Sequence, residues 1–147
     1  MMSPSTPVMA AGTGSPAYCQ TFPCAPETAV IGRRLVRDAL GAWHLADLTD
    51  PAALIISELI ANAAEHTSCR SIRLTVGRPS PAWVRVGVMD RAPGLVPELR
   101  PVADDMESGR GLLLVDALAD RWGYDLRGIG GRPWGKEVWG ELRVGGR

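Results

Sequence analysis

Hydrophobic and polar positions recur with a helical period in two segments of the N-terminal half. Apolar residues return every three or four positions over residues 30–43, which is typical of an amphipathic helix. Gly41 and the turn that follows are expected to end this helix. Asp50 followed by Pro51 favours a new helix start, because aspartate caps free N–H groups and proline fits the first turn. This pattern predicts a second helix that ends near His66.

A two-residue period predicts strands elsewhere. Residues 71–76 and 83–89 alternate polar and apolar side chains, and the Arg78–Pro81 segment between them indicates a hairpin. Further strands are predicted at 17–22, at 124–127 and at 137–144, the last two joined by a glycine-rich turn at 128–133.

The segment from Asp90 to Ser108 has no periodicity and contains several prolines, so it is predicted to be a long loop. Loops of this length in compact domains are often functional. A third helix is predicted from Gly109 to Trp122. The order of elements favours an α+β fold: a two-layer sandwich with a mixed, mostly antiparallel sheet, helices on one face, and a crevice where the long loop crosses.

Composition and charge exclude several classes of protein. The chain has 147 residues, with 16 Lys+Arg against 16 Asp+Glu, so it lacks the basic surplus typical of nucleic-acid binders. Hydrophobic residues at 46% are enough for a core. Residues 1–16 are expected to be a flexible tail, and 17–147 a single domain. No apolar run has bilayer length and no signal-peptide pattern is present, so a cytoplasmic protein without a membrane partner is expected.

The rare residue types of the chain bear on the source of the gene and on the possibility of a metal site or disulfides. The only lysine is Lys136 and the only asparagine is Asn62, which indicates a gene from a GC-rich genome. The two histidines lack a paired spacing with the cysteines, so a zinc site is not favoured. Ordinary reduced thiols are expected at all three cysteines, Cys19, Cys24 and Cys69.

The second predicted helix carries a polar stripe. Glu58, Asn62 and His66 are spaced four apart and therefore project from one side. A solvated face is one interpretation. However, this helix is apolar nearly all round, which indicates burial, and buried polar groups need partners. Magnesium with phosphate oxygens would satisfy the amide, and a water or hydroxyl held for attack would satisfy the carboxylate.

Two further segments carry candidate chemistry. Asp90 ends a predicted strand, where aspartate is most often a turn cap, but in a nucleotide pocket it would accept a hydrogen bond from an adenine amino group. Gly94 would let the backbone approach the base. The run Ser108-Gly-Arg-Gly-Leu112 precedes a helix, whose free N–H groups attract phosphate. A serine cap with tolerated glycines is the other interpretation.

Four motifs in this order resemble the Bergerat-fold ATPase superfamily of gyrase, heat-shock chaperone, histidine kinase and mismatch-repair ATPases. Within it the chain is most similar to small actinomycete regulators that resemble anti-sigma-factor serine/threonine kinases. The resemblance covers about residues 22–144. It rests on Glu58-Leu-Ile-Ala-Asn62, Asp90-Arg-Ala-Pro-Gly94, Ser108-Gly-Arg-Gly-Leu112, and Gly135-Lys-Glu-Val-Trp139 with Glu141.

The resemblance implies an ATP site with Mg²⁺. It assigns Asn62 to the metal, Asp90 to adenine, and Glu58 to the role of general base in transfer to a serine hydroxyl or water. The cofactor-binding residues that it implies besides these are His66, Ala92, Gly94, Gly109, Arg110, Gly111 and Leu112. The implied partners are a sigma factor or the antagonist that carries the target serine, and relatives commonly form homodimers.

Three departures from the family pattern bear on activity. Ala92 stands where many relatives have glycine. Glu107 stands where kinase-active relatives often have an arginine for the γ-phosphate, and a negative residue there would repel phosphate unless it pairs with Arg110. The threonine common beside adenine is matched by Lys136 or Glu137. The alternatives to a kinase are a catalytically weak, nucleotide-gated binding module and an adaptor that binds no ligand.

Overall fold

The computed structural model describes residues 9–10, 16–66, 70–91, 94, 107–129 and 131–145. Within these residues six strands form one sheet in the order β1-β2-β3-β4-β6-β5, and all neighbouring strands are antiparallel. The strands are β1 (Met9–Ala10), β2 (Pro16–Pro23), β3 (Ser71–Ser80), β4 (Trp83–Asp90), β5 (Arg121–Ile129) and β6 (Arg132–Arg143). The helices are α1 (Thr28–Ala42), the 3-10 turn η1 (Ala46–Leu48), α2 (Thr49–His66) and α3 (Glu107–Leu118).

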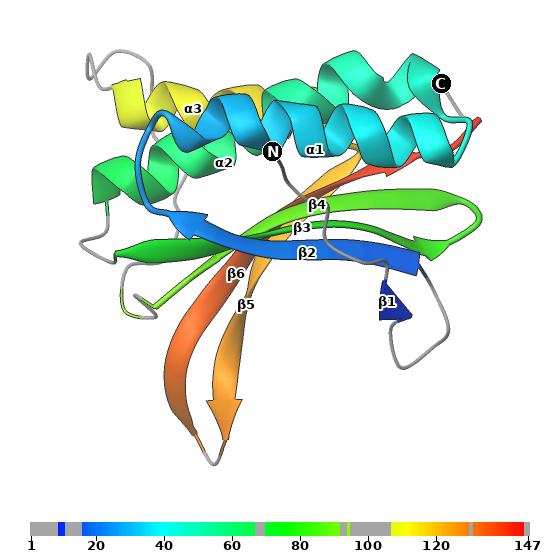
Figure 1. Cartoon of the computed structure of the whole chain (residues 1–147). Coiled ribbons are helices and arrows are strands. Elements are labelled where there is room, and N and C mark those ends of the chain that lie inside the picture. The colour runs from blue at the N-terminus through cyan, green and yellow to red at the C-terminus, as the bar shows by residue number, and fades with distance from the viewer. Residues whose placement is uncertain are drawn as a thin grey trace.

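The helices form one layer over a single face of the sheet, while the β5–β6 hairpin extends beyond that layer (Figure 1). The predicted α+β sandwich with helices on one face is therefore confirmed, as are both predicted hairpins. Residues 1–16, expected to be a tail, contribute three described residues to the sheet, because Met9 and Ala10 form β1 and Pro16 begins β2.

The core lies between the helices and the inner face of the sheet. Strand alternation sends every second side chain of β3, β4 and β6 inward, including Leu74, Val86 and Val138, where α1 and α2 cover them. Helix α2 packs over β6 at Gly140, where an added Cβ would lie 3.0 Å from Ile55 Cγ2. The missing side chain at this position lets helix and strand approach closely.

Helix α2 is buried along most of its surface, as its apolar composition predicts. Its one buried hydroxyl is satisfied within the helical layer. The Ser57 hydroxyl donates to the Ala53 carbonyl at 2.9 Å and accepts from Arg33 Nη1 of α1 at 3.0 Å. This contact ties the two long helices together above the sheet.

Several element boundaries differ from those predicted. Helix α1 continues one residue past Gly41 to Ala42, and His44, two residues later, has a φ of 59° in the left-handed region. Helix α2 begins at Thr49, directly after η1, so Asp50 lies in its first turn and is not the cap. Helix α3 stops at Leu118, because the chain turns there to enter β5.

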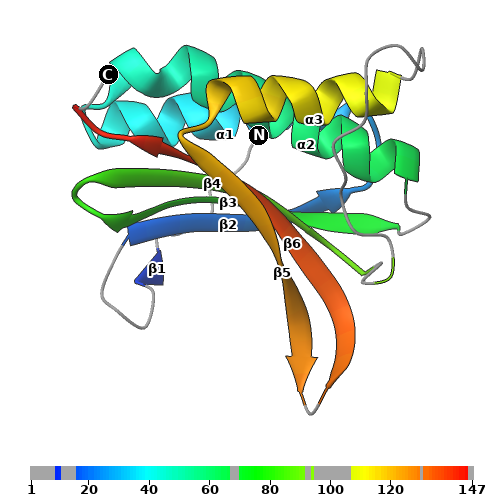
Figure 2. The same cartoon turned by 180° about the vertical axis from the view of Figure 1, so that it is seen from behind.

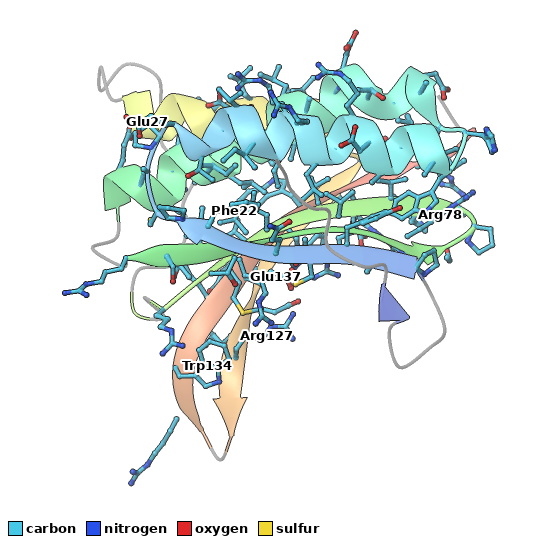
Figure 3. All side chains as sticks on the ribbon, in the orientation of Figure 1. Phe22, Glu27, Arg78, Arg127, Trp134 and Glu137 are labelled. Carbon is cyan, nitrogen blue, oxygen red and sulfur yellow. The ribbon has the colours of Figure 1, made fainter. Side chains whose placement is uncertain are left out.

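The outer face of the sheet carries a network of ion pairs. Glu137 and Glu141 project there from β6 and are only 5% and 4% exposed. Arg85 of β4 lies between them, 3.7 and 3.4 Å from their carboxylates, and its guanidinium stacks 4.3 Å from the centre of the Trp139 ring. Arg127 also pairs with Glu137, on the side of the sheet away from the helices (Figure 3). The arginines and the indole shield both carboxylates from water.

Candidate functional site

The end of α2 and the end of β4 lie at the same end of the sheet. After His66 the chain enters β3 at Ser71, and β3 pairs with β4 so that Arg73 lies opposite Met89. The last turn of α2 is therefore placed near the strand end that carries Asp90. Asn62 lies one turn before the end of the helix and Glu58 lies at its middle, and both are half-buried.

The N-terminus of α3 reaches the same end. The C-terminal end of α3 packs against Gly140 of β6, close to where β5 begins. A Cβ added to Gly140 would lie 3.8 Å from Val115 and 3.6 Å from Ala119. The helix therefore runs back from its start toward that point, antiparallel to β5. Figures 1 and 2 show the beginning of α3 beside the final turns of α2. The two helices are in contact with one another.

Axial distances place the polar stripe level with the strand end. Ile55 contacts Gly140, and a helical rise of about 1.5 Å per residue puts Asn62 roughly 10 Å farther along α2. Lys136 is about 13 Å from Gly140 along β6 at roughly 3.3 Å per strand residue. Asn62 and the pair Asp90–Lys136 are thus brought to about the same level by elements far apart in sequence, and Glu58 lies one helical turn, about 6 Å, before Asn62.

The carboxylate of Asp90 is buried and held by Lys136. The two residues pair across β4 and β6, and each is 3% exposed. The lysine Nζ lies 3.0 Å from both carboxylate oxygens and donates to each. Two opposite charges are stable at such depth only when they are paired in good geometry. The sequence analysis did not predict this contact. The signal that could have pointed to it is that Lys136 is the only lysine of the chain, whose other basic residues of this kind are arginines.

The register of β6 decides which closing-strand residue faces the helices. Lys136 shares the inner face with Val138 and Gly140, whereas Glu137 faces outward and pairs with Arg85 and Arg127. Of the two residues matched to the threonine of the family pattern, Lys136 is therefore the one beside Asp90.

For the other residues predicted to bind the cofactor, the structure gives only the position in an element or the burial. Gly94 lies in an exposed turn, where an added Cβ would have no neighbour within 4 Å. Leu112 is buried in the α3 interface. The helix begins at Glu107, so Ser108 lies inside its first turn and does not cap it. The backbones of Gly109, Arg110 and Gly111 belong to the first turns of α3 and that of His66 ends α2, while Ala92 and most of the long loop lie outside the described residues.

Gly135 brings the backbone of β6 against Asp90. A Cβ there would lie well inside contact distance of the Asp90 carbonyl oxygen, which is backbone and cannot turn away. We expect Gly135→Ala to cost about 1–3 kcal/mol in free energy of unfolding, as overpacking does. Denaturant unfolding monitored by tryptophan fluorescence measures this loss.

Gly41→Ala is the matched control for Gly135→Ala. Gly41 is an exposed residue of α1, and a Cβ there would have no neighbour within 4 Å. The same substitution should therefore stabilise the protein by about 0.5–1 kcal/mol, since alanine is the better helix former. Equal effects of the two substitutions would show that Gly135 is not needed for the close approach.

Comparison with known proteins identifies the family of this chain. Residues 22–139 match the family model described as the histidine kinase-like ATPase domain. This chain belongs to that family. It is also 52% identical over 79 residues to an uncharacterized protein of Streptomyces coelicolor, an alignment that covers 50% of this chain and 71% of the relative.

Domains of this family use ATP, so membership of the family indicates that this chain binds ATP. The described part of the chain holds no group of three or more His, Cys, Asp or Glu residues that could bind a metal by themselves. A magnesium ion that enters with a nucleotide needs only one or two protein oxygens besides the phosphates, and the half-buried carboxamide of Asn62 fits this role. No described helix has both the length and the apolarity needed to span a membrane.

Proposed function

We propose that this protein is an ATP-binding regulator that acts as a serine/threonine kinase of the anti-sigma-factor type. The observation that carries the proposal is the half-buried pair on α2, where Glu58 precedes Asn62 by one turn and Asn62 lies at the same end of the sheet as Asp90 and the start of α3. In this proposal Glu58 is the general base and Asn62 is a metal ligand. Asp90 recognises the nucleobase, and the start of α3 binds phosphate.

The residues present suit a bound nucleotide triphosphate. The Asp90 carboxylate accepts hydrogen bonds from an exocyclic amino group of the base. The first turn of α3, which includes Gly109, presents backbone N–H groups and a positive dipole end to phosphate. Asn62 supplies a carboxamide oxygen for Mg²⁺, which neutralises charge on the phosphates when it is bound.

Glu58 performs the proton transfer in this proposal. Its carboxylate accepts the proton of the serine or threonine hydroxyl of the partner protein, so that the hydroxyl oxygen becomes a better nucleophile. A bond forms between that oxygen and the γ-phosphorus while the bond from the γ-phosphorus to the bridging oxygen breaks, and ADP leaves. Glu58 is half-buried, so its carboxylate is partly shielded from bulk water.

The partner is proposed to be a sigma factor or the antagonist protein that carries the target hydroxyl, with the regulator in the cytoplasm and able to form a homodimer. A second candidate function is a nucleotide-gated binding module that transfers nothing. One feature favours it: Glu107 stands at the start of α3, where kinase-active relatives often have an arginine for the γ-phosphate.

Phosphotransfer to a partner separates these two functions. The purified chain is incubated with Mg²⁺ and γ-labelled ATP together with candidate sigma factors and antagonist proteins. A kinase transfers label to a serine or threonine of one of them. Label that never leaves ATP, in a mixture where ATP strengthens the complex with a partner, would instead support the binding module.

A further inference from the structure

Strand β5 forms one edge of the sheet. It pairs with β6 on one side, and within the described residues no strand pairs with its other side. The strand is nine residues long and contains no proline, whereas β1 at the opposite edge has only two residues. A long edge strand presents a row of N–H and C=O groups with which a further strand can pair.

The inner face of this edge carries exposed apolar side chains. Tyr124 and Leu126 lie opposite Val138 and Lys136, so they point to the side of the sheet on which the helices lie. They are nevertheless 41% and 51% exposed, because the hairpin extends beyond the helical layer (Figures 1 and 2). A strand added beside β5 would cover both side chains.

The outer face of the same edge carries neighbouring charges of opposite sign. Asp125 accepts a hydrogen bond from Arg85 through one oxygen, at 3.0 Å, and its side chain is 48% exposed. Arg127 binds Glu137 through Nη2, but its Nε has no acceptor among the described residues. Edges that resist pairing usually carry charges that repel a second copy. An aspartate two residues before an arginine attracts one instead.

Two antiparallel copies of β5 match one another when the two-fold axis passes through Leu126. Asp125 of each copy then lies opposite Arg127 of the other, and Leu126 lies opposite itself. Opposite charges at directly paired positions stabilise two strands, and so does contact between apolar side chains. A register that pairs Asp125 with Arg121 is less favourable, because Arg121 is already bonded to Glu141 and stacked on the Trp83 ring.

We infer that β5 is the interface of a homodimer, in which two copies join edge to edge about an axis at Leu126 and form one continuous antiparallel sheet. A second copy is the occupant because the edge is complementary to itself in charge. The inference names the surface of the homodimer in the proposed function and rests on that part of it alone. Since one pair of strands buries less area than a stable dimer does, the dissociation constant should be on the order of 1–100 μM.

Sedimentation velocity of the full chain without nucleotide tests the inference. We expect the sedimentation coefficient to rise from that of a monomer to that of a dimer as the concentration increases from about 1 μM to about 1 mM. A chain that remains monomeric throughout would overturn the inference and leave the edge to a strand of another protein. The proposed phosphoryl transfer would still stand, because labelled ATP measures it separately.

Leu126→Lys locates the interface. Because this residue faces its own copy across the axis, the substitution places two ammonium groups opposite one another and should raise the dissociation constant by about tenfold or more. Leu54→Lys is the control, because Leu54 is 39% exposed on a different element, α2, and its substitution should leave the dimer intact. A dimer that survives Leu126→Lys, or that both substitutions weaken equally, would overturn the inference.

Leu126→Cys tests the register directly and applies even if Leu126→Lys fails to fold. Cβ atoms directly opposite one another in an antiparallel pair are about 4.5–5.5 Å apart, close to the spacing of a disulfide. Oxidised glutathione should therefore produce a covalent dimer of this variant. The native chain under the same conditions gives the background from its own three cysteines. Cross-linking no greater than that background would overturn the inference.

Discussion

Glu58→Gln is expected to slow phosphoryl transfer to the partner hydroxyl by about 10²–10⁴-fold, the usual contribution of a general base. The amide has nearly the same shape but cannot take the proton. Nucleotide affinity should change by less than about twofold, since the proposed role is in the chemical step and not in binding. Single-turnover transfer from γ-labelled ATP measures the rate, and calorimetry measures the affinity.

Glu65→Gln provides the matched control for Glu58→Gln. Glu65 lies on the same helix but is exposed, so its loss of charge should leave the transfer rate unchanged. Undiminished transfer in the Glu58 variant would remove that residue from the role of base. Loss of transfer in both variants would indicate that net charge on α2 matters and that no single carboxylate acts as the base.

Asn62→Ala is expected to abolish most of the stabilisation that Mg·ATP gives to the fold. At a ligand concentration 100 times the dissociation constant, binding to the native chain stabilises it by about 2.7 kcal/mol, a rise in Tm on the order of 5–10 °C for a domain of this size. Without the carboxamide oxygen the metal loses a protein ligand, so the variant should show little of this shift. Thermal unfolding with and without Mg·ATP measures the difference.

The other carboxamide of the chain serves as the control for Asn62→Ala. Gln20 lies on β2, which β3 separates from β4 and its Asp90, so Gln20→Ala should keep the full shift in Tm on addition of Mg·ATP. The native chain with ATP and a chelator should behave like the Asn62 variant. A full shift in the Asn62 variant would mean that the asparagine does not bind the metal.

The fold was largely predictable because its periodicities are local. The apolar spacing in α1 and α2 and the alternation in β3 and β4 reflect burial of one face, and the structure confirms these elements. The boundaries were less predictable. The spacing of apolar residues continues past Leu118 toward Trp122, but pairing of Trp122 with Gly140 in the sheet overrides the helical pattern there.

The candidate site was predictable only in its local parts. Glu58 and Asn62 are one turn apart on a helix, which sequence spacing reveals directly. The contact between Asp90 and Lys136 joins residues 46 positions apart, and it depends on the register of β6 against β4. A shift of one residue would have turned Glu137 toward the helices instead of Lys136. Non-local register of this kind leaves no periodic signal in the sequence.

The central claim is that a nucleotide with its magnesium ion binds at the end of α2. The chain has one asparagine and one glutamine, so its ¹⁵N-correlated NMR spectrum contains two side-chain carboxamide groups, those of Asn62 and Gln20. On addition of Mg·adenylyl imidodiphosphate the account predicts that the Asn62 NH₂ signals shift while those of Gln20 stay in place. Asn62 signals that remain unmoved at saturating nucleotide would contradict it.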